Sequence, residues 1–246
     1  MSKLRDRLRE TTRRRRGGLG FAPGSDDGPG GHVLVVAEVT DATATRSAVE
    51  AGAGALIAGV DEAAIAAVAE AAGDAPAGMR LEDATAGQTK IAAEAGADFF
   101  VFDDARAAAG ALLERKLGRV MLLEADADED RLRMLAPLRL DAVLLAAQSA
   151  APTVRDQLAL RRIVQLTQAP LLLAVTEAVT AETLEVWRDS GAPAVLVPAG
   201  NPALLAEIIA AAGEVGPPRT PESDERPDPL LPSISSAPAD EHDHSE

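Results

Sequence analysis

Short apolar runs alternate with Ala-rich amphipathic stretches through the body of the chain, residues 32–215. A strand pattern that alternates with a helical pattern, at a spacing of roughly twenty-odd residues, is typical of an α/β protein with a parallel sheet. Eight such units are enough to close a (β/α)8 barrel, which is the fold that we expect. The runs are Val33–Val39, Ala55–Val60, Ala77–Leu81, Phe99–Phe102, Val120–Leu123, Ala142–Ala146, Leu171–Val175 and Ala194–Val197.

Turn residues support this division of the chain. Gly52, Gly96 and Gly191 each stand shortly before a run, where a residue with positive φ commonly ends a helix. The weakest strand is Ala77–Leu81, because it contains a glycine and an arginine. If this run is not a strand, an open doubly wound sheet is the alternative fold.

The two ends of the chain differ in composition from the body. Residues 1–16 hold eight basic and two acidic residues, residues 17–31 are rich in Gly, Pro and Asp, and residues 216–246 hold eight acidic residues and two arginines. Such segments bury too little apolar surface to fold alone, so we expect a disordered basic arm and linker (1–31) and a disordered acidic tail (216–246). Leu4 and Leu8 are at helical spacing. The arm is therefore either solvated or a short basic helix on a membrane, an RNA or an acidic partner segment.

The composition excludes several functional classes. The 246 residues contain no cysteine, which rules out disulfides, thiolate metal ligands and cysteine nucleophiles. The net charge of -15 argues against nucleic-acid binding by the barrel, because phosphates would be repelled. No apolar stretch approaches the roughly 18 residues that span a bilayer, and no organic cofactor is indicated. The sequence predicts a cytoplasmic protein.

Acidic residues follow five of the predicted strands. In a barrel the carboxyl ends of all strands meet at one rim, where ligands bind. By strand parity, Glu38 lies on the same side as Leu34 and Val36. Glu124 shares a side with Leu122, and Glu177 shares a side with Val175. Parity alone does not tell which side faces the barrel axis. The five residues are Glu38, Glu82, Asp103, Glu124 and Glu177.

Carboxylates that converge either raise one another's pKa or recruit a cation. An all-oxygen cluster suits Mg²⁺, and Glu38, Asp103 and Glu124 are the candidate ligands. Carboxyl groups with a raised pKa also serve as general acids or bases, so Glu124 and Glu82 are candidate catalytic residues. The alternative is that the rim residues are only solvated or cap helices. Capping is the role expected for Asp41, Asp61, Asp83, Asp104 and Asp128.

Two features can bind an anion. Arg80 is the one basic residue inside a predicted strand, and it either pairs with the acidic rim or holds a phosphate or carboxylate in bidentate fashion. We count it among the candidate catalytic residues. The turn Gly200-Asn201 leads into the last predicted helix, whose free N–H groups attract anions. Gln148 and Glu177 complete the predicted ligand-binding set.

The segment Asp189–Val197 and the glycine turn after it resemble the phosphate-binding branch of the aldolase-type TIM barrels. That resemblance implies a TIM barrel with a phosphate site after strands seven and eight, although Glu177 stands near the position where that group has glycine. The run that ends at Glu124 is also similar to the metal-dependent class II aldolases acting on 2-oxo acids. This second similarity implies a metal-binding role for Glu124. The segment 146–149 has no acidic residue where the second metal ligand of that family belongs.

Two functional hypotheses follow. In the first, the acidic rim binds a small oxo-acid or a phosphorylated metabolite, with Mg²⁺ as a candidate cofactor and lyase or aldolase-like chemistry at most. In the second, the barrel is catalytically silent and acts as an interaction or scaffold protein that contacts protein partners through its charged tails. The second is favoured by the absence of tyrosine and by the positions of all lysines and histidines outside the predicted strands.

Overall fold

The computed structural model describes residues 2–12, 31–59, 62–124, 126–146 and 149–218. Its eight strands form a closed barrel in which every strand pairs in parallel with its sequence neighbours and β8 pairs with β1. This confirms the (β/α)8 barrel, and the alternative of an open doubly wound sheet is wrong. The strands are β1 Leu34–Val39, β2 Ala55–Ala58, β3 Ala77–Arg80, β4 Phe99–Asp103, β5 Gly118–Leu123, β6 Ala142–Leu145, β7 Leu171–Ala174 and β8 Ala194–Val197.

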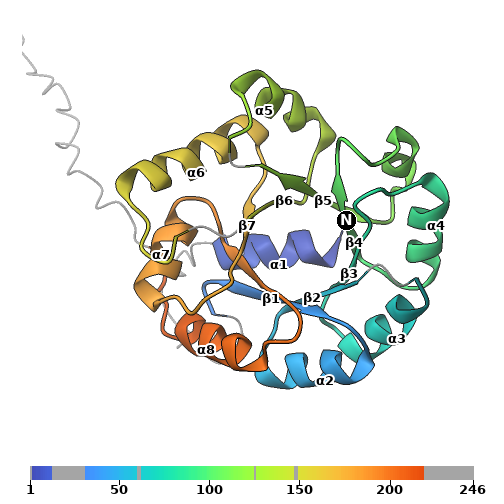
Figure 1. The fold of residues 1–246 in the computed structure, drawn as a ribbon, viewed down its shortest axis with the longest axis horizontal. Helices are drawn as coiled ribbons and strands as arrows, with labels where there is room; N and C mark the ends of the chain where they lie inside the picture. Colours follow the sequence, from blue (N-terminus) through green and yellow to red (C-terminus); the bar gives the residue numbers. More distant parts are fainter. Residues whose placement is uncertain (1, 13–30, 60–61, 125, 147–148, 219–246) are drawn as a thin grey trace, which may run out of the picture.

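Helices surround the barrel as an outer ring (Figure 1). One 3₁₀ helix, η1 Ala109–Leu113, stands between β4 and β5, and a second, η2 Ala136–Leu138, follows α5. The α-helices of the ring are α2 Ala42–Ala51, α3 Glu62–Ala72, α4 Ala86–Glu94, α5 Glu129–Leu135, α6 Val154–Thr167, α7 Ala181–Asp189 and α8 Pro202–Gly213.

Two of the expected acidic caps are confirmed. Asp41 accepts hydrogen bonds from the first backbone N–H groups of α2, and Asp128 does the same for α5. The prediction for Asp83 is wrong, because the residue that caps α4 is Thr85, which forms a capping box with Gln88. The prediction for Asp104 is also wrong, since it pairs with a side chain of α5. Asp61 lies outside the described residues.

The strands carry two separate apolar layers. One layer faces the helices, and the other fills the barrel interior. Gly78 shows how closely the interior is packed: a Cβ atom there would lie 2.3 Å from the ring of Phe99. The glycine that weakens the strand signal of β3 therefore makes room for an aromatic side chain. The strand residues of the interior cluster are Leu34, Val36, Ala55, Ile57, Phe99, Val101, Val120, Ala142, Leu144, Leu172, Ala194 and Leu196.

A helix closes the amino-terminal end of the barrel. Helix α1, Lys3–Thr12, lies across the ring of strands (blue in Figure 1). Leu4 and Leu8 are only 1% and 3% exposed and belong to the interior cluster. The Asp98 carboxylate, just before β4, accepts hydrogen bonds from the N–H groups of Lys3 at 2.8 Å and Leu4 at 2.9 Å. The expectation of a disordered arm is thus wrong for residues 2–12. Residues 13–30 and 219–246 lie outside the described part of the chain.

Within the described ranges, no helix has the length and apolar character needed to cross a membrane.

Candidate functional site

The barrel interior settles which way the strand residues point. Glu38 alternates with Leu34 and Val36, both members of the interior cluster, and Asp103 alternates with Phe99 and Val101 of the same cluster. Arg80 has the parity of Gly78, which lies against the interior ring of Phe99. Glu38, Arg80 and Asp103 therefore project toward the barrel axis at its carboxyl-terminal rim.

Two further predicted rim carboxylates, Glu124 and Glu177, differ from each other. Glu124 follows β5 directly and has the parity of Leu122, which packs on the interior cluster. Glu177 has the parity of Leu173 and Val175, which pack in the layer that faces the helices. Glu177 is exposed in the turn between β7 and α7. The five carboxylates do not all converge on the axis.

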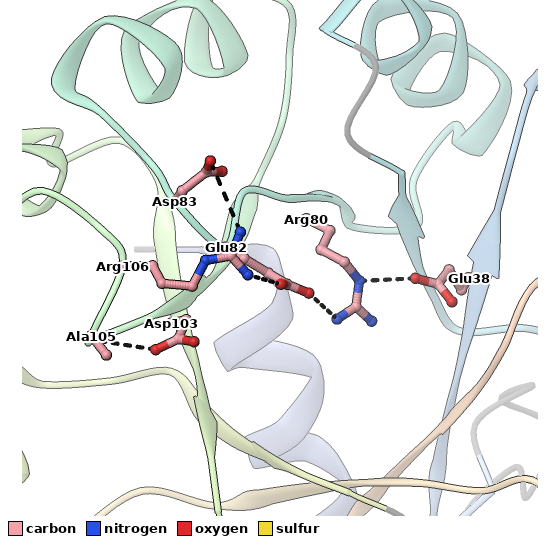
Figure 2. A network of polar contacts seen from close by, with 7 residues as sticks. All are labelled: Glu38, Arg80, Glu82, Asp83, Asp103, Ala105 and Arg106. Atoms are coloured by element: carbon pink, nitrogen blue, oxygen red, sulfur yellow. Dashed lines mark hydrogen bonds and ion pairs between the residues drawn. The ribbon is translucent and has the colours of Figure 1, made fainter.

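Arg80 is held between two carboxylates (Figure 2). Its Nε donates to Glu38 Oε1 at 2.9 Å, and its Nη1 donates to Glu82 Oε1 at 3.5 Å. The side chains of Arg80 and Glu38 are 21% and 22% exposed, so both ion pairs lie partly out of water. Because two carboxylates bind different nitrogens of the guanidinium, they hold its plane in one orientation.

The second oxygen of Glu82 extends this network toward the outside. Arg106 Nη1 donates to Glu82 Oε2 at 2.7 Å, and Arg106 Nη2 lies 4.0 Å from Asp83 Oδ2. We call the five residues Glu38, Arg80, Glu82, Asp83 and Arg106 the rim network. Both Glu82 oxygens are engaged by arginines, so Glu82 orients Arg80, and its catalytic role remains a prediction from the sequence.

Asp103 and Arg131 stand beside the rim network. Asp103 Oδ1 accepts from the backbone N–H of Ala105 at 2.9 Å, which fixes one edge of its carboxylate. Arg131 Nη2 pairs with Asp104 Oδ1 at 2.7 Å, and this pair raises the pKa of Arg131. Sequence patterns did not single out Arg131, because it lies on a helix with several other exposed charges.

A cavity of about 500 Å³ opens at the carboxyl-terminal mouth of the barrel. We call it the mouth cavity. Its floor is apolar, with Leu122, Leu144, Ala174 and Leu196 from four strands. The charged side chains that line it are Arg80, Asp103, Glu124 and Arg131. Two positive and two negative groups therefore surround an apolar floor.

The carboxylates of the rim do not form a metal cage in the described part of the chain. No group of three or more His, Asp or Glu side chains there is arranged to hold a metal ion. Glu38 is bound to Arg80, and Asp103 is bound to a backbone N–H group. These two side chains fit the predicted Mg²⁺ site poorly, and the metal remains a prediction from the sequence.

The predicted anion site before α8 lies apart from the mouth cavity. Gly200 has a φ of 81°, and Asn201 caps α8 by accepting from the N–H of Leu204 at 3.0 Å. Neither residue lines the mouth cavity. Gln148 lies outside the described residues. Phosphate binding at this turn remains a prediction.

No protein-family model and no curated protein matches the sequence. Among solved structures, the chain is similar to tryptophan synthase from M. tuberculosis in an aminoacrylate- and BRD0059-bound form, with 16% identity, a TM-score of 0.60, and coverage of 87% of this chain and 96% of that one. It is also similar to thiamine phosphate pyrophosphorylase from Pyrococcus furiosus, with 14% identity, a TM-score of 0.54, and coverage of 74% and 93%. Identities this low show a shared fold alone, and at that level they agree with the closed (β/α)8 barrel.

Proposed function

We propose that the mouth cavity binds a small organic acid that also carries hydroxyl or amine groups, such as a hydroxylated 2-oxo acid or a phosphorylated metabolite. The observation that carries this proposal is the fixed position of Arg80 at the wall of the cavity. A volume of about 500 Å³ lies within the usual range for small-molecule sites. The apolar floor accommodates a short carbon chain.

Arg80 is the group that receives the acid. A guanidinium has five N–H donors, and Glu38 and Glu82 take only two of them. The remaining donors form a planar fork that matches a carboxylate or a phosphate. Because two carboxylates already orient the side chain, less conformational entropy is lost when the ligand binds.

Asp103 and Glu124 complement the other end of such a ligand. Both line the mouth cavity, and both accept hydrogen bonds from hydroxyl or amine groups. Glu124 also lies near Arg131, whose pKa its charge helps to raise, and we assign the proton transfer to Glu124 because it lines the cavity beside Arg80. A proton transfer by Glu124 next to an acid held by Arg80 is the minimum that lyase or aldolase-like chemistry requires.

A scaffold function without catalysis is the second candidate. It is favoured by one feature of the composition: the chain has no cysteine or tyrosine, and its three lysines are Lys3, Lys90 and Lys116, none of which lines the mouth cavity. A scaffold that acts through the tails does not need a ligand in the mouth cavity. The two candidates therefore differ in whether Arg80 has a ligand.

Binding of hydroxypyruvate and of 3-phosphoglycerate, measured by calorimetric titration, tests the proposal. We expect at least one of the two to bind the full chain and Arg80→Gln to weaken that binding about tenfold or more, because a charge-assisted hydrogen bond contributes roughly 1.5–3 kcal/mol. Arg106→Gln is the matched control, since Arg106 shares Glu82 with Arg80 but does not line the cavity.

Glu124→Gln then separates binding from proton transfer. We expect this variant to keep most of the affinity and to lose any turnover of the bound acid. If neither acid binds the full chain, or if Arg80→Gln and Arg106→Gln weaken binding equally, Arg80 does not hold the ligand and the scaffold function is favoured. Circular dichroism of each variant confirms that the barrel is folded.

A further inference from the structure

A second cavity, lined mainly by basic side chains, lies at the amino-terminal end of the barrel. It measures about 290 Å³ and is bordered by the first residue of β5, Gly118, and by Ser2 next to α1. We call it the basal pocket. Among its lining residues are five cations and one acid, namely Arg5, Arg115, Lys116, Arg119, Arg139 and Asp141. The whole chain has a net charge of -15, so this local excess of positive charge is unusual for the protein.

Two of the arginines are fixed parts of the pocket wall. Arg5 Nη2 pairs with Asp141 Oδ1 at 2.5 Å and donates to the carbonyl of Arg139 at 2.7 Å. Arg119 donates to the carbonyls of Leu112 and Leu138. Bonds to carbonyl oxygens orient these guanidinium groups without cancelling the charge of Arg119. Asp141, the acid of the pocket, is 5% exposed and is already neutralised by Arg5.

The other three cations carry charge that is not paired. Arg115, Lys116 and Arg139 are exposed, and none of them forms an ion pair within the described ranges. The neighbouring acid Glu114 uses Oε1 to accept from the backbone N–H of Lys116 at 2.8 Å. Three exposed cations beside two fixed arginines produce a positive potential that a small anion would relieve.

Arg139 adds a conformational argument. It ends η2 with φ 52° and ψ 52°, the left-handed conformation that glycine adopts most readily at this position. If this position served only to end the helix, glycine or asparagine would adopt the required backbone conformation more easily than arginine does. The presence of arginine at position 139 therefore suggests that its positive charge has a role.

We propose that the basal pocket binds a phosphate-class oxyanion, either free phosphate or the phosphate group of a small ester. Arg115, Lys116 and Arg139 would contact the anion, and Arg119 would contribute charge from the wall. Ser2 and Arg5 also line the pocket, and they hold the start of α1 against Asp141. Anion binding is therefore linked to the docking of α1 on the amino-terminal end of the barrel. This site is separate from the mouth cavity and does not depend on the function proposed for it.

Thermal denaturation of the full chain in inorganic phosphate, in glycerol 3-phosphate and in sodium chloride of equal ionic strength tests this proposal. We expect the two phosphates to raise the melting temperature more than chloride does, because they bind only the folded state. Amide hydrogen exchange in α1 should slow in phosphate as well. A response to free phosphate alone would identify the free ion as the ligand, and a stronger response to the ester would identify the ester.

Two variants and two controls locate the site. The double variant Arg115→Gln, Lys116→Gln and the single variant Arg139→Gly should each weaken phosphate binding about tenfold. Arg139→Gly should do so without lowering the melting temperature in chloride, because glycine relaxes the backbone at this cap. Lys90→Gln, an exposed charge on α4, should leave the phosphate effect unchanged, and Arg80→Gln, in the mouth cavity, measures how much of the effect comes from that other site.

An equal effect of chloride, or an equal loss in Lys90→Gln, would show general charge screening and overturn the proposal. Loss of the phosphate effect in Arg80→Gln alone would also overturn it, because the anion would then bind in the mouth cavity. That outcome would support the function proposed for the mouth cavity. Conversely, failure of hydroxypyruvate and 3-phosphoglycerate to bind at Arg80 leaves the result at the basal pocket unaffected.

Discussion

Replacement of Leu8 by alanine tests whether α1 is an integral part of the barrel. Leu8 is 3% exposed and belongs to the same interior cluster as the strand residues that point into the barrel. Removal of a buried leucine side chain from a packed core costs about 2–5 kcal/mol of unfolding free energy, which includes the cavity that remains. The lower part of this range applies if α1 shifts to fill the space.

Urea denaturation followed by tryptophan fluorescence measures this change. Trp187 is the single tryptophan of the chain, is 1% exposed, and lies on α7, so it reports on unfolding of the barrel rather than on movement of α1. We expect Leu8→Ala to lower the free energy of unfolding by about 2–5 kcal/mol. Glu10→Ala, on the exposed side of the same helix, should change it by less than about 0.5 kcal/mol.

Amide hydrogen exchange distinguishes two ways in which stability can be lost. If α1 undocks as a unit before the barrel unfolds, its amides lose protection in Leu8→Ala while the fluorescence transition moves little. If α1 and the barrel unfold together, both measurements change together. Leu8→Ala with unaltered urea transition and unaltered exchange in α1 would refute the conclusion that this helix covers the barrel floor.

Two further predictions concern packing and pH. Gly78→Ala should destabilise the barrel by about 1–3 kcal/mol in urea denaturation, because the added methyl group collides with the Phe99 ring. Gly73→Ala is the comparison: its Cβ would have open space around it, so only backbone strain acts there. Burial raises the pKa of Asp98, so the folded protein binds more protons at this carboxyl group than the unfolded chain does. The contribution of Asp98 to stability is therefore full below the unfolded pKa of 3.8 and is lost as the pH rises through the folded pKa. The unfolding free energy of the native chain minus that of Asp98→Asn should therefore increase as pH falls from 7 toward 4, and a decrease over that range would contradict the assignment.

The sequence by itself determined the number and order of the strands. Apolar runs separated by helical stretches specify eight β/α units, which are enough to close a barrel, and the pairing of β8 with β1 shows that the sheet is closed. Helix boundaries were predictable where a local cap fixes them, as at Asp41 and Asp128. They were wrong at Asp83, because Thr85 and Gln88 together form the stronger cap.

Strand parity defined the two sides of each strand but not which side is inside. Glu38 and Glu177 look alike in the sequence, since each stands at the carboxyl end of an apolar run and shares the parity of apolar residues in that run. Only the packing of Leu34 and Val36 in the interior, and of Leu173 and Val175 under the helices, separates them. Burial of a face is a property of the assembled barrel, so no local pattern specifies it.

The partners of the charged groups and the place of α1 were decided by the tertiary structure. Arg80 lies 42 residues from Glu38 in the sequence, and Arg5 lies far from Asp141, yet barrel closure brings each pair into contact. Leu4 and Leu8 sit in a basic segment whose composition predicts disorder, and they are buried because the barrel floor presents an apolar layer that needs a cover. Local sequence fixes which residues prefer helix or strand, whereas long-range packing fixes which surfaces meet.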